Sequence, residues 1–310
     1  MRTREKELDM AAERMIVNGD VELWTEEFGD PAHPPVLLVM GSMSQGVLWP
    51  DAFVGRLVAA GRRVIRYDHR DTGKSSAIDF ENAPYTWADI AKDALAVLDA
   101  YGIDKAHFVG HSAGGLISQW IAVEQPERVL SLTVIGSSPL GREEGANLVR
   151  ALMGEDPLPG ALPYPTPAFI EHFSKMMTNP PGPDRRSQID VAIETARVLH
   201  GPAIPFDEDE QRRLEEKIFD RDRDPATVGN HRLAAMADPA FEPVGVLDRI
   251  TAPTLAIEGT EEPAKPGHSA LIAAAIPGAE LLMIEGMGHT LPPQIHAQLA
   301  DAILAHTRTT

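Results

Sequence analysis

The sequence predicts an α/β protein with a mostly parallel sheet, helices on both faces and a helical lid inserted into the chain. Short apolar runs alternate with segments of helical periodicity, a rhythm typical of a parallel sheet. The rhythm stops near Pro139 and returns near Pro243, and 14 of the 26 prolines lie between them. We therefore expect residues 15–138 and 244–310 to form the core, residues 139–243 the lid, and residues 1–14 a charged N-terminal extension.

The amino-acid composition and net charge exclude several classes of partner and of catalysis. The 310 residues are 43% hydrophobic, enough for one large core. The net charge of −18 repels phosphate groups, so nucleic-acid and anionic-membrane partners are not expected. With no cysteine, disulfides, thiolate catalysis and cysteine-based zinc sites are excluded. No apolar run reaches the roughly 18 residues of a membrane span, so the chain is expected in the cytoplasm. Its oligomeric state stays open.

The first half of the chain has five predicted elements. Asn18-Gly19 between two β-like runs indicates a hairpin. A continuous apolar run predicts a strand buried on both faces, and glycines at the ends of helical patterns predict C-terminal caps. In chain order after the hairpin, these elements are a strand in residues 34–42, a helix in residues 51–61, a strand with a polar loop in "RRVIRYDHRDTGKS", and a helix in "TWADIAKDALAVLDAYGI".

The second half repeats the pattern around the lid. Within the lid, residues 184–199 and 208–219 have helical periodicity. The elements expected in the core are strands in "KAHFVG", "LSLTVIGSS", "APTLAIEGT" and "AELLMIEG", a helix in residues 269–275 and a C-terminal helix in residues 293–307.

The stretch "FVGHSAGGLISQW" places Ser112 between small residues where a strand turns into a helix. Gly-x-Ser-x-Gly in this context is the pattern of a nucleophile elbow, in which a strained turn lifts the serine Oγ off the sheet. The alternative is a chance match that forms an ordinary tight turn. The strand before and the helix after the motif favour a nucleophile.

A serine nucleophile needs a base, and His289 is the candidate. It follows a late strand in "LLMIEGMGHTLPP", and the ends of parallel strands face the crevice where ligands bind. A purely structural histidine is the alternative interpretation. His111 is expected to pack or shape the pocket, and His268 and His296 lie on helical stretches, which makes them weaker candidates.

The triad acid is expected after the strand "APTLAIEG", because the order Ser, acid, His is that of α/β-hydrolases. Glu262, three residues after Gly259, stands where Asp is usual. Glu261 and Glu258 are rivals, although Glu258 is expected within the strand. An exposed acidic loop with the acid elsewhere is the remaining alternative.

Two backbone N–H groups are candidates for an oxyanion hole. The N–H of Ala113 follows the serine at a helix N-terminus, where the helix dipole favours an anion. The second donor is expected in the turn "MGSM" after the strand "VLLVM", with the N–H of Ser42 as the candidate. Backbone donors leave the side-chain identity at these positions unconstrained.

These residues and their surroundings resemble the aclacinomycin methylesterase family, which are polyketide-tailoring α/β-hydrolases of actinomycetes. The similar segments cover both halves of the core from about Ile16 onward, and the lid matches less clearly. They are "GDVELWTEEFGDPAHPPVLLVMG", "VIRYDHRDTGKS", "AVLDAYGIDKAHFVG", "APTLAIEGTEEP" and "IPGAELLMIEGMGHTLPPQIHAQLADAILAHTR". The acid is Glu262 and not Asp, and the elbow "GHSAGG" lacks the bulkier, Met-containing sequence of the family. Both departures affect the pocket or the triad and leave the reaction class unchanged.

The resemblance implies an α/β-hydrolase fold and a triad of Ser112, Glu262 and His289, with Ser42 and Ala113 as oxyanion donors. It implies a carboxylesterase acting through an acyl-enzyme on a small-molecule substrate, such as the methyl ester of a bulky apolar or polyketide-like compound. No cofactor or metal is expected. The alternatives are C–C or amide cleavage on the same triad, and a ligand-binding protein without hydrolytic activity. The polar loop "YDHRDTGKS" is expected to be structural.

The first prediction concerns the nucleophile. A fluorophosphonate probe is expected to label Ser112 alone, because only an activated serine attacks phosphorus at a useful rate. Ser112→Ala is expected to lose several orders of magnitude in kcat and still fold, since the change is small. Peptide mass spectrometry locates the label. Labelling at another serine, or full activity of the Ala variant, would refute the assignment.

Overall fold

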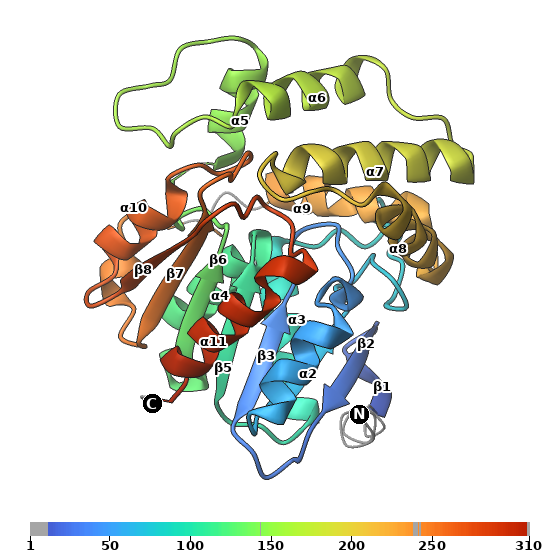
Figure 1. The fold of residues 1–310 in the computed structure, drawn as a ribbon. Coiled ribbons are helices and arrows are strands. Elements are labelled where there is room, and N and C mark those ends of the chain that lie inside the picture. The colour runs from blue at the N-terminus through green and yellow to red at the C-terminus, as the bar shows by residue number, and fades with distance from the viewer. Residues whose placement is uncertain (1–11, 143, 238–240, 242, 309–310) are drawn as a thin grey trace.

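An eight-stranded sheet runs through the structure in the order β1-β2-β4-β3-β5-β6-β7-β8 (Figure 1). The computed structural model describes residues 12–142, 144–237, 241 and 243–308. β1 and β2 pair antiparallel, β2 is antiparallel to β4, and the pairs from β4 to β8 are parallel. The strands are β1 (Ala12–Asn18), β2 (Val21–Phe28), β3 (Pro35–Val39), β4 (Arg63–Tyr67), β5 (Ala106–His111), β6 (Val129–Ile135), β7 (Thr254–Gly259) and β8 (Glu280–Ile284). This confirms the predicted fold class and the predicted strands.

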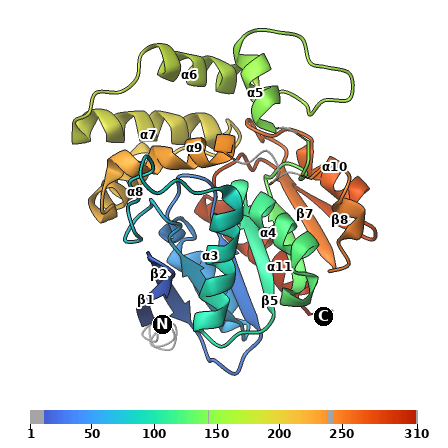
Figure 2. The same cartoon turned by 180° about the vertical axis from the view of Figure 1, so that it is seen from behind.

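Helices cover both faces of the sheet, as Figures 1 and 2 show. Side chains of α2 (Asp51–Ala59) and α11 (His296–His306) bury one face, and those of α3 (Trp87–Ala100), α4 (Ala113–Glu124) and α10 (His268–Ala275) bury the other. Along β3, Val36 and Leu38 face the first layer, whereas Leu37 and Val39 face the second. The continuous apolar run in β3 therefore reflects burial on both sides.

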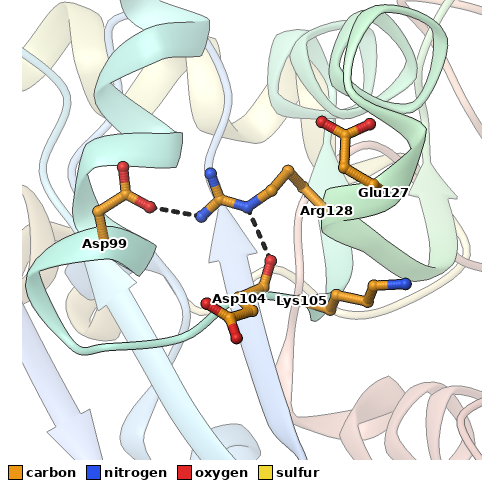
Figure 3. A pocket seen from close by; sticks show the side chains of 5 residues that line it. All are labelled: Asp99, Asp104, Lys105, Glu127 and Arg128. Atoms are coloured by element: carbon orange, nitrogen blue, oxygen red, sulfur yellow. Dashed lines mark hydrogen bonds and ion pairs between the residues drawn. The ribbon is translucent and has the colours of Figure 1, made fainter.

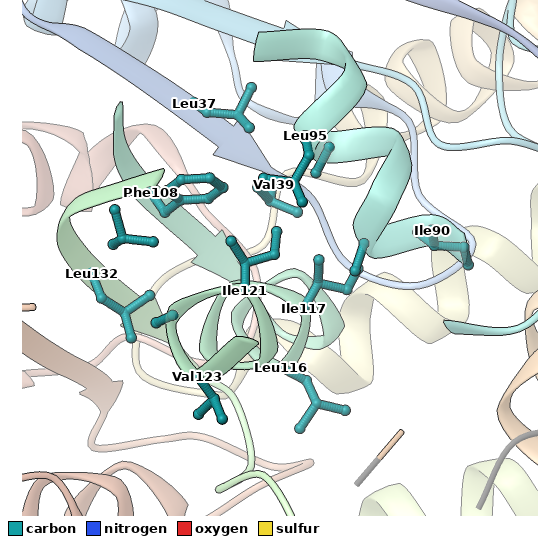
Figure 4. Close-up of a cluster of buried hydrophobic side chains, with 14 of the residues drawn as sticks. Leu37, Val39, Ile90, Leu95, Phe108, Leu116, Ile117, Ile121, Val123 and Leu132 are labelled. Carbon is teal, nitrogen blue, oxygen red and sulfur yellow. The ribbon is translucent and has the colours of Figure 1, made fainter. Parts of the chain in front are cut away.

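The central helix α4 is buried on most of its circumference (Figure 4). Ile117 and Ile121 lie against the sheet residues Val39 and Phe108, all fully buried. A helix that is apolar nearly all round is typical of the inside of a protein. This packing holds the junction between β5 and α4 in place.

The inserted segment, residues 139–243 between β6 and β7, forms helices that lie over one end of the sheet (Figure 1). These are α5 (Glu144–Leu152), α6 (Pro167–Thr178), α7 (Arg185–His200), α8 (Glu208–Arg221) and α9 (Asn230–Ala237). The helices predicted at residues 184–199 and 208–219 correspond to α7 and α8, whose first turns are capped by Asp184 and Asp207. Helices α5, α6 and α9 were not predicted from the sequence.

The N-terminal strand begins earlier than expected. Ala12 pairs with Glu27, so residues 12–14, assigned above to an N-terminal extension, belong to the sheet. The Glu13 carboxylate accepts a hydrogen bond from Trp24 Nε1 and pairs with Lys74, which gives this charged residue a place in a strand. Residues 1–11 of the expected extension lie outside the described residues. Among the helices of the described chain, none is both long and apolar enough to cross a membrane.

Four buried histidines are held neutral in the fold. Burial is the largest cause and lowers the pKa of His111 to about 3 and the pKa values of His69, His107 and His231 to about 4. At His107, Arg62 and His306 lower the pKa further. An unfolded chain binds these protons near pH 6.5, so unfolding takes up protons below that pH.

The second prediction follows from this linkage. Above about pH 6.5 the four histidines do not reduce the free energy of unfolding. As the pH falls toward 4, the free energy of unfolding declines by up to about 1.4 kcal/mol per pH unit for each histidine. His107, which bonds Ser131 Oγ, isolates one such group. In urea unfolding between pH 6 and pH 4.5, His107→Gln is expected to show a free energy of unfolding that declines less steeply than that of the parent. Parallel slopes would contradict this account.

Candidate active site

Ser112 has a strained backbone at the end of β5, with φ 54° and ψ −122°. A residue other than glycine in such a conformation costs on the order of 1–3 kcal/mol. A Cβ at Gly110 would lie 2.3 Å from the Gly114 carbonyl oxygen, and a Cβ at Gly114 would lie 2.1 Å from that of Val39. The two glycines of the motif therefore permit the close approach of strand, turn and helix.

Glu262 and His289 form a buried pair. Nδ1 of His289 lies 2.8 and 2.9 Å from the two carboxylate oxygens of Glu262. The Glu262 side chain also accepts the N–H groups of Ala264 at 2.8 Å and Lys265 at 3.1 Å. Burial raises the pKa of Glu262, but His289 and these two N–H groups together lower it by more, so the pKa lies below its usual value. The Glu262 carboxylate is therefore ionised at neutral pH, and its contacts to the imidazole are at Nδ1.

The two rival carboxylates have other surroundings. Glu258 lies in β7 and accepts the N–H groups of Gly267 at 2.6 Å and Ser269 at 2.8 Å at the start of α10. Glu261 lies on the same loop as Glu262, but its side chain starts beside the inserted segment: a Cβ built at Gly201 would lie 2.9 Å from the Glu261 Cβ. The structure thus brings Glu262 to the imidazole and neither rival.

The C-terminal end of β6 contacts both Ser112 and His289. The N–H of Ser112 donates to the Ile135 carbonyl at 2.8 Å. The next residue, Gly136, has φ 52°, and a Cβ there would lie 3.2 Å from His289 Nδ1. His111 Nε2 donates to the His289 carbonyl at 2.8 Å, and the two rings lie 4.8 Å apart.

No hydrogen bond between Ser112 Oγ and His289 Nε2 forms within the described part of the chain. Such bonds are often long before substrate binds and tighten in the complex. His111 supports the backbone of His289, as its expected packing role implies. The other histidines considered above hold the fold: His268 bonds Ser138 Oγ and the Pro163 carbonyl, and His296 bonds the Leu291 carbonyl.

The two candidate oxyanion donors lie in segments next to Ser112. Ala113 opens α4, and a Cβ at Gly41, next to Ser42, would lie 3.2 Å from the Ser112 Cβ. Of the described residues, none accepts a hydrogen bond from the N–H of Ser42 or Ala113.

The inserted segment also contacts the loop that carries His289, and this contact was not predicted from the sequence. The carbonyl of Leu199, near the end of α7, accepts the N–H of His289 at 2.6 Å. A Cβ at Gly288 would lie 2.2 Å from the His200 carbonyl oxygen, so only glycine allows this approach. His200 Nδ1 bonds Thr290 Oγ1 at 3.0 Å. Gly288 beside the histidine was the one available signal of this packing.

Two surface depressions lie away from these residues. One has a volume of about 320 Å³ and is lined by Asp99, Asp104, Lys105, Glu127 and Arg128 (Figure 3). Its residues precede β5 and β6, so the length of β5 separates it from Ser112. There Arg128 is bound by Asp99 at 2.6 Å and the Asp104 carbonyl at 2.7 Å. The other, of about 590 Å³, is lined by residues 205–209 and Gln294. Neither contains Ser112, and the described residues include no cluster of three metal-ligating side chains.

Comparisons with known proteins agree with the fold described above. A model of the alpha/beta hydrolase fold matches residues 34–293. Rhodomycin D methylesterase DnrP of Streptomyces peucetius is 43% identical over 302 residues, or 95% of this chain and 98% of that protein. An esterase from Exiguobacterium antarcticum has a TM-score of 0.73 at 18% identity, covering 96% and 100% of the chains. The structure titled "Est816 as an N-Acyl homoserine lactone degrading enzyme" has a TM-score of 0.66 at 23% identity, covering 96% and 98%.

The third prediction separates the two neighbouring acids. Glu262→Gln is expected to lower kcat by about 10²–10⁴, because a triad acid orients the imidazole and stabilises its charged form. Glu261→Gln, with the same chemical change one residue away, is expected to stay within a few-fold of the parent. Steady-state kinetics on one ester compares the two. Equal effects, or a larger effect at Glu261, would show that Glu262 is not the acid.

Proposed function

The chain belongs to the α/β-hydrolase family and is a carboxylic ester hydrolase, and we propose that it acts as a serine esterase through Ser112, His289 and Glu262. The observation that carries the proposal is the buried Glu262–His289 pair, with Nδ1 2.8 Å from the nearer carboxylate oxygen. It lies beside a serine whose backbone is strained in the manner of a nucleophile elbow.

The proposed reaction has two halves. Ser112 Oγ attacks the ester carbonyl while His289 Nε2 takes the hydroxyl proton, and the tetrahedral anion accepts the N–H groups of Ser42 and Ala113. The C–O bond of the ester breaks, and the alcohol leaves with the proton from His289. A water molecule then attacks the acyl-serine by the same route, which releases the acid and restores the Ser112 hydroxyl.

Charge stabilisation supplies much of the proposed rate. One oxyanion donor is worth roughly 2.7–4 kcal/mol in enzymes of this type. The lowered pKa of Glu262 keeps its carboxylate ionised, and that charge stabilises the imidazolium formed when His289 takes the proton. Burial of both side chains, 3% and 8% exposed, strengthens this interaction by excluding water.

For the substrate, we propose a methyl ester of a bulky, largely apolar acid such as a polyketide. Similarity to rhodomycin D methylesterase DnrP along nearly the whole chain supports a methyl ester. We also propose that residues 139–243 act as a lid over a core of residues 15–138 and 244–310. Aromatic side chains of the lid offer apolar surface: Phe169 stacks on Phe173 at 4.3 Å, and Phe206 packs on His200 at 5.2 Å.

Some apolar side chains of the lid face solvent instead. Met153, Met177 and Met236 are 70%, 71% and 82% exposed. They therefore do not belong to a closed apolar pocket in this conformation. The buried Phe169 and the half-buried Phe173 are better placed to contact a bound acyl group.

The fourth prediction tests substrate class. Methyl anthracene carboxylate is expected to exceed methyl acetate in kcat/KM by roughly 10- to 100-fold, since about 100 Å² more buried apolar surface is worth roughly 2.5 kcal/mol. Methanol release measures both. Monomethyl succinate, an aryl anilide and a β-diketone complete the panel. A higher kcat/KM for the charged monomethyl succinate would contradict an apolar pocket. Faster cleavage of the anilide or the diketone than of the esters would contradict the esterase assignment.

A further inference from the structure

His231 in helix α9 reaches from the lid to the turn that carries the proposed oxyanion donor Ser42. The N–H of Met43 donates to His231 Nδ1 at 2.9 Å. On the other side of the ring, Nε2 lies 2.8 Å from the Arg70 carbonyl oxygen. A backbone N–H can only donate and a carbonyl can only accept, so Nδ1 carries the lone pair and Nε2 the proton. Burial lowers the pKa of His231 to about 4, which keeps the ring in this neutral form.

A second histidine holds the same turn from the core. His69 follows β4 in the loop "YDHRDTGKS", and its Nε2 donates to the Met40 carbonyl at 2.9 Å. Both rings are almost fully buried, and their centroids lie 5.9 Å apart. The loop expected above to be structural therefore reaches the proposed oxyanion hole.

These bonds fix the peptides on both sides of the Ser42 N–H. A peptide unit is planar, so holding one of its polar groups orients the whole unit. His69 holds the Met40–Gly41 unit by its carbonyl. His231 holds the Ser42–Met43 unit by its N–H, and Ser44 Oγ lies 3.2 Å from the carbonyl of that unit. The Gly41–Ser42 unit between them carries the Ser42 N–H, and this N–H has no acceptor among the described residues.

The turn needs such support because Met43 is strained. Its φ is 58°, in the left-handed region that residues other than glycine rarely adopt. Such a conformation costs on the order of 1–3 kcal/mol and persists only where the surroundings hold it. Without the His231 bond, the Ser42–Met43 unit would be free to rotate, and the neighbouring Gly41–Ser42 unit, which carries the Ser42 N–H, would lose its support on that side.

We propose that His231 is a positioning residue that orients the Ser42 N–H for the oxyanion and thereby makes catalysis depend on docking of lid helix α9. This inference rests on the proposed function. It differs from a simple anchoring role, because α9 has another anchor: Asn230 Nδ2 donates to Asp71 Oδ2 at 3.1 Å and to the Ile78 carbonyl at 2.9 Å.

The fifth prediction uses the two ring nitrogens separately. In His231→Asn, the side-chain oxygen replaces Nδ1 and can still accept the Met43 N–H. In His231→Gln, the amide replaces Nε2 and keeps only the bond to Arg70. Since full loss of an oxyanion donor costs about 10²–10³ in kcat, His231→Gln and His231→Leu are expected to lose about 10- to 100-fold, with KM changed less than about 3-fold. His231→Asn is expected to retain kcat within about 5-fold.

A binding measurement tests whether the loss occurs at the oxyanion. Benzyl trifluoromethyl ketone adds to the Ser112 Oγ and places an anion in the hole, whereas methyl phenylacetate binds Ser112→Ala without reaction. His231→Leu is expected to weaken the affinity for the ketone by the same factor by which it lowers kcat. In the Ser112→Ala background, His231→Leu is expected to leave the affinity for the ester unchanged. The control Asn230→Ala removes the other anchor of α9. It is expected to lower the thermal midpoint and to preserve kcat well below that midpoint, because the two His231 bonds still hold α9 at the turn.

The outcomes distinguish failure of the proposed role of His231 from failure of the proposed function. Equal kcat values for His231→Asn and His231→Gln, unchanged kcat in His231→Leu, or a loss confined to KM would overturn the role of His231. If His231→Leu does not fold, the Asn and Gln variants decide. If Ser112→Ala retains activity, the proposed function itself fails. If Ser112→Ala is inactive and the His231 variants are all unaffected, only this inference fails.

Discussion

The close backbone packing around Ser112 is the constraint on which the rest of the site depends. Gly110 and Gly114 let β5, the turn and α4 approach to distances that no side chain would allow. Ser112 is held in a strained conformation as a result, and its N–H is fixed on Ile135 of the neighbouring strand. Burial of α4 on most of its surface supplies the stability that balances this strain.

The inserted segment completes the site in this account. The carbonyl of Leu199 holds the backbone of His289, and His231 holds the turn beside Ser42. The C-terminal end of α8 is also tied to the core, because Arg221 pairs with the buried Asp68 at 3.1 Å and Asp222 accepts the Gly73 N–H at 2.6 Å. In the proposed mechanism, the inserted segment and the rest of the chain share the groups that orient the base and the oxyanion hole. Displacement of this segment is therefore expected to affect chemistry as well as access.

Much of the fold was predictable because its strands are apolar on both faces and its core helices are periodic. The sequence also indicated Ser112, Glu262 and His289, since each follows a strand that ends at the same edge of the sheet. Of the contact between Leu199 and His289, the sequence showed only Gly288, which does not identify its partner. The strain at Met43 was not predictable, because backbone conformation at this position has no residue-type signature. Helix α9 has only 8 residues, too few for a clear helical period in the sequence. The role proposed for His231 was therefore not predictable either.

Direct detection of the acyl-enzyme tests the central claim most sharply. The enzyme is mixed with methyl phenylacetate in ¹⁸O-labelled water, quenched in acid and digested. We expect a phenylacetyl group on the peptide that carries Ser112, heavy oxygen in the released acid and none in the methanol, because the acyl C–O bond is the one that breaks. An adduct on another residue, heavy oxygen in the methanol, or hydrolysis that persists in Ser112→Ala would contradict the account.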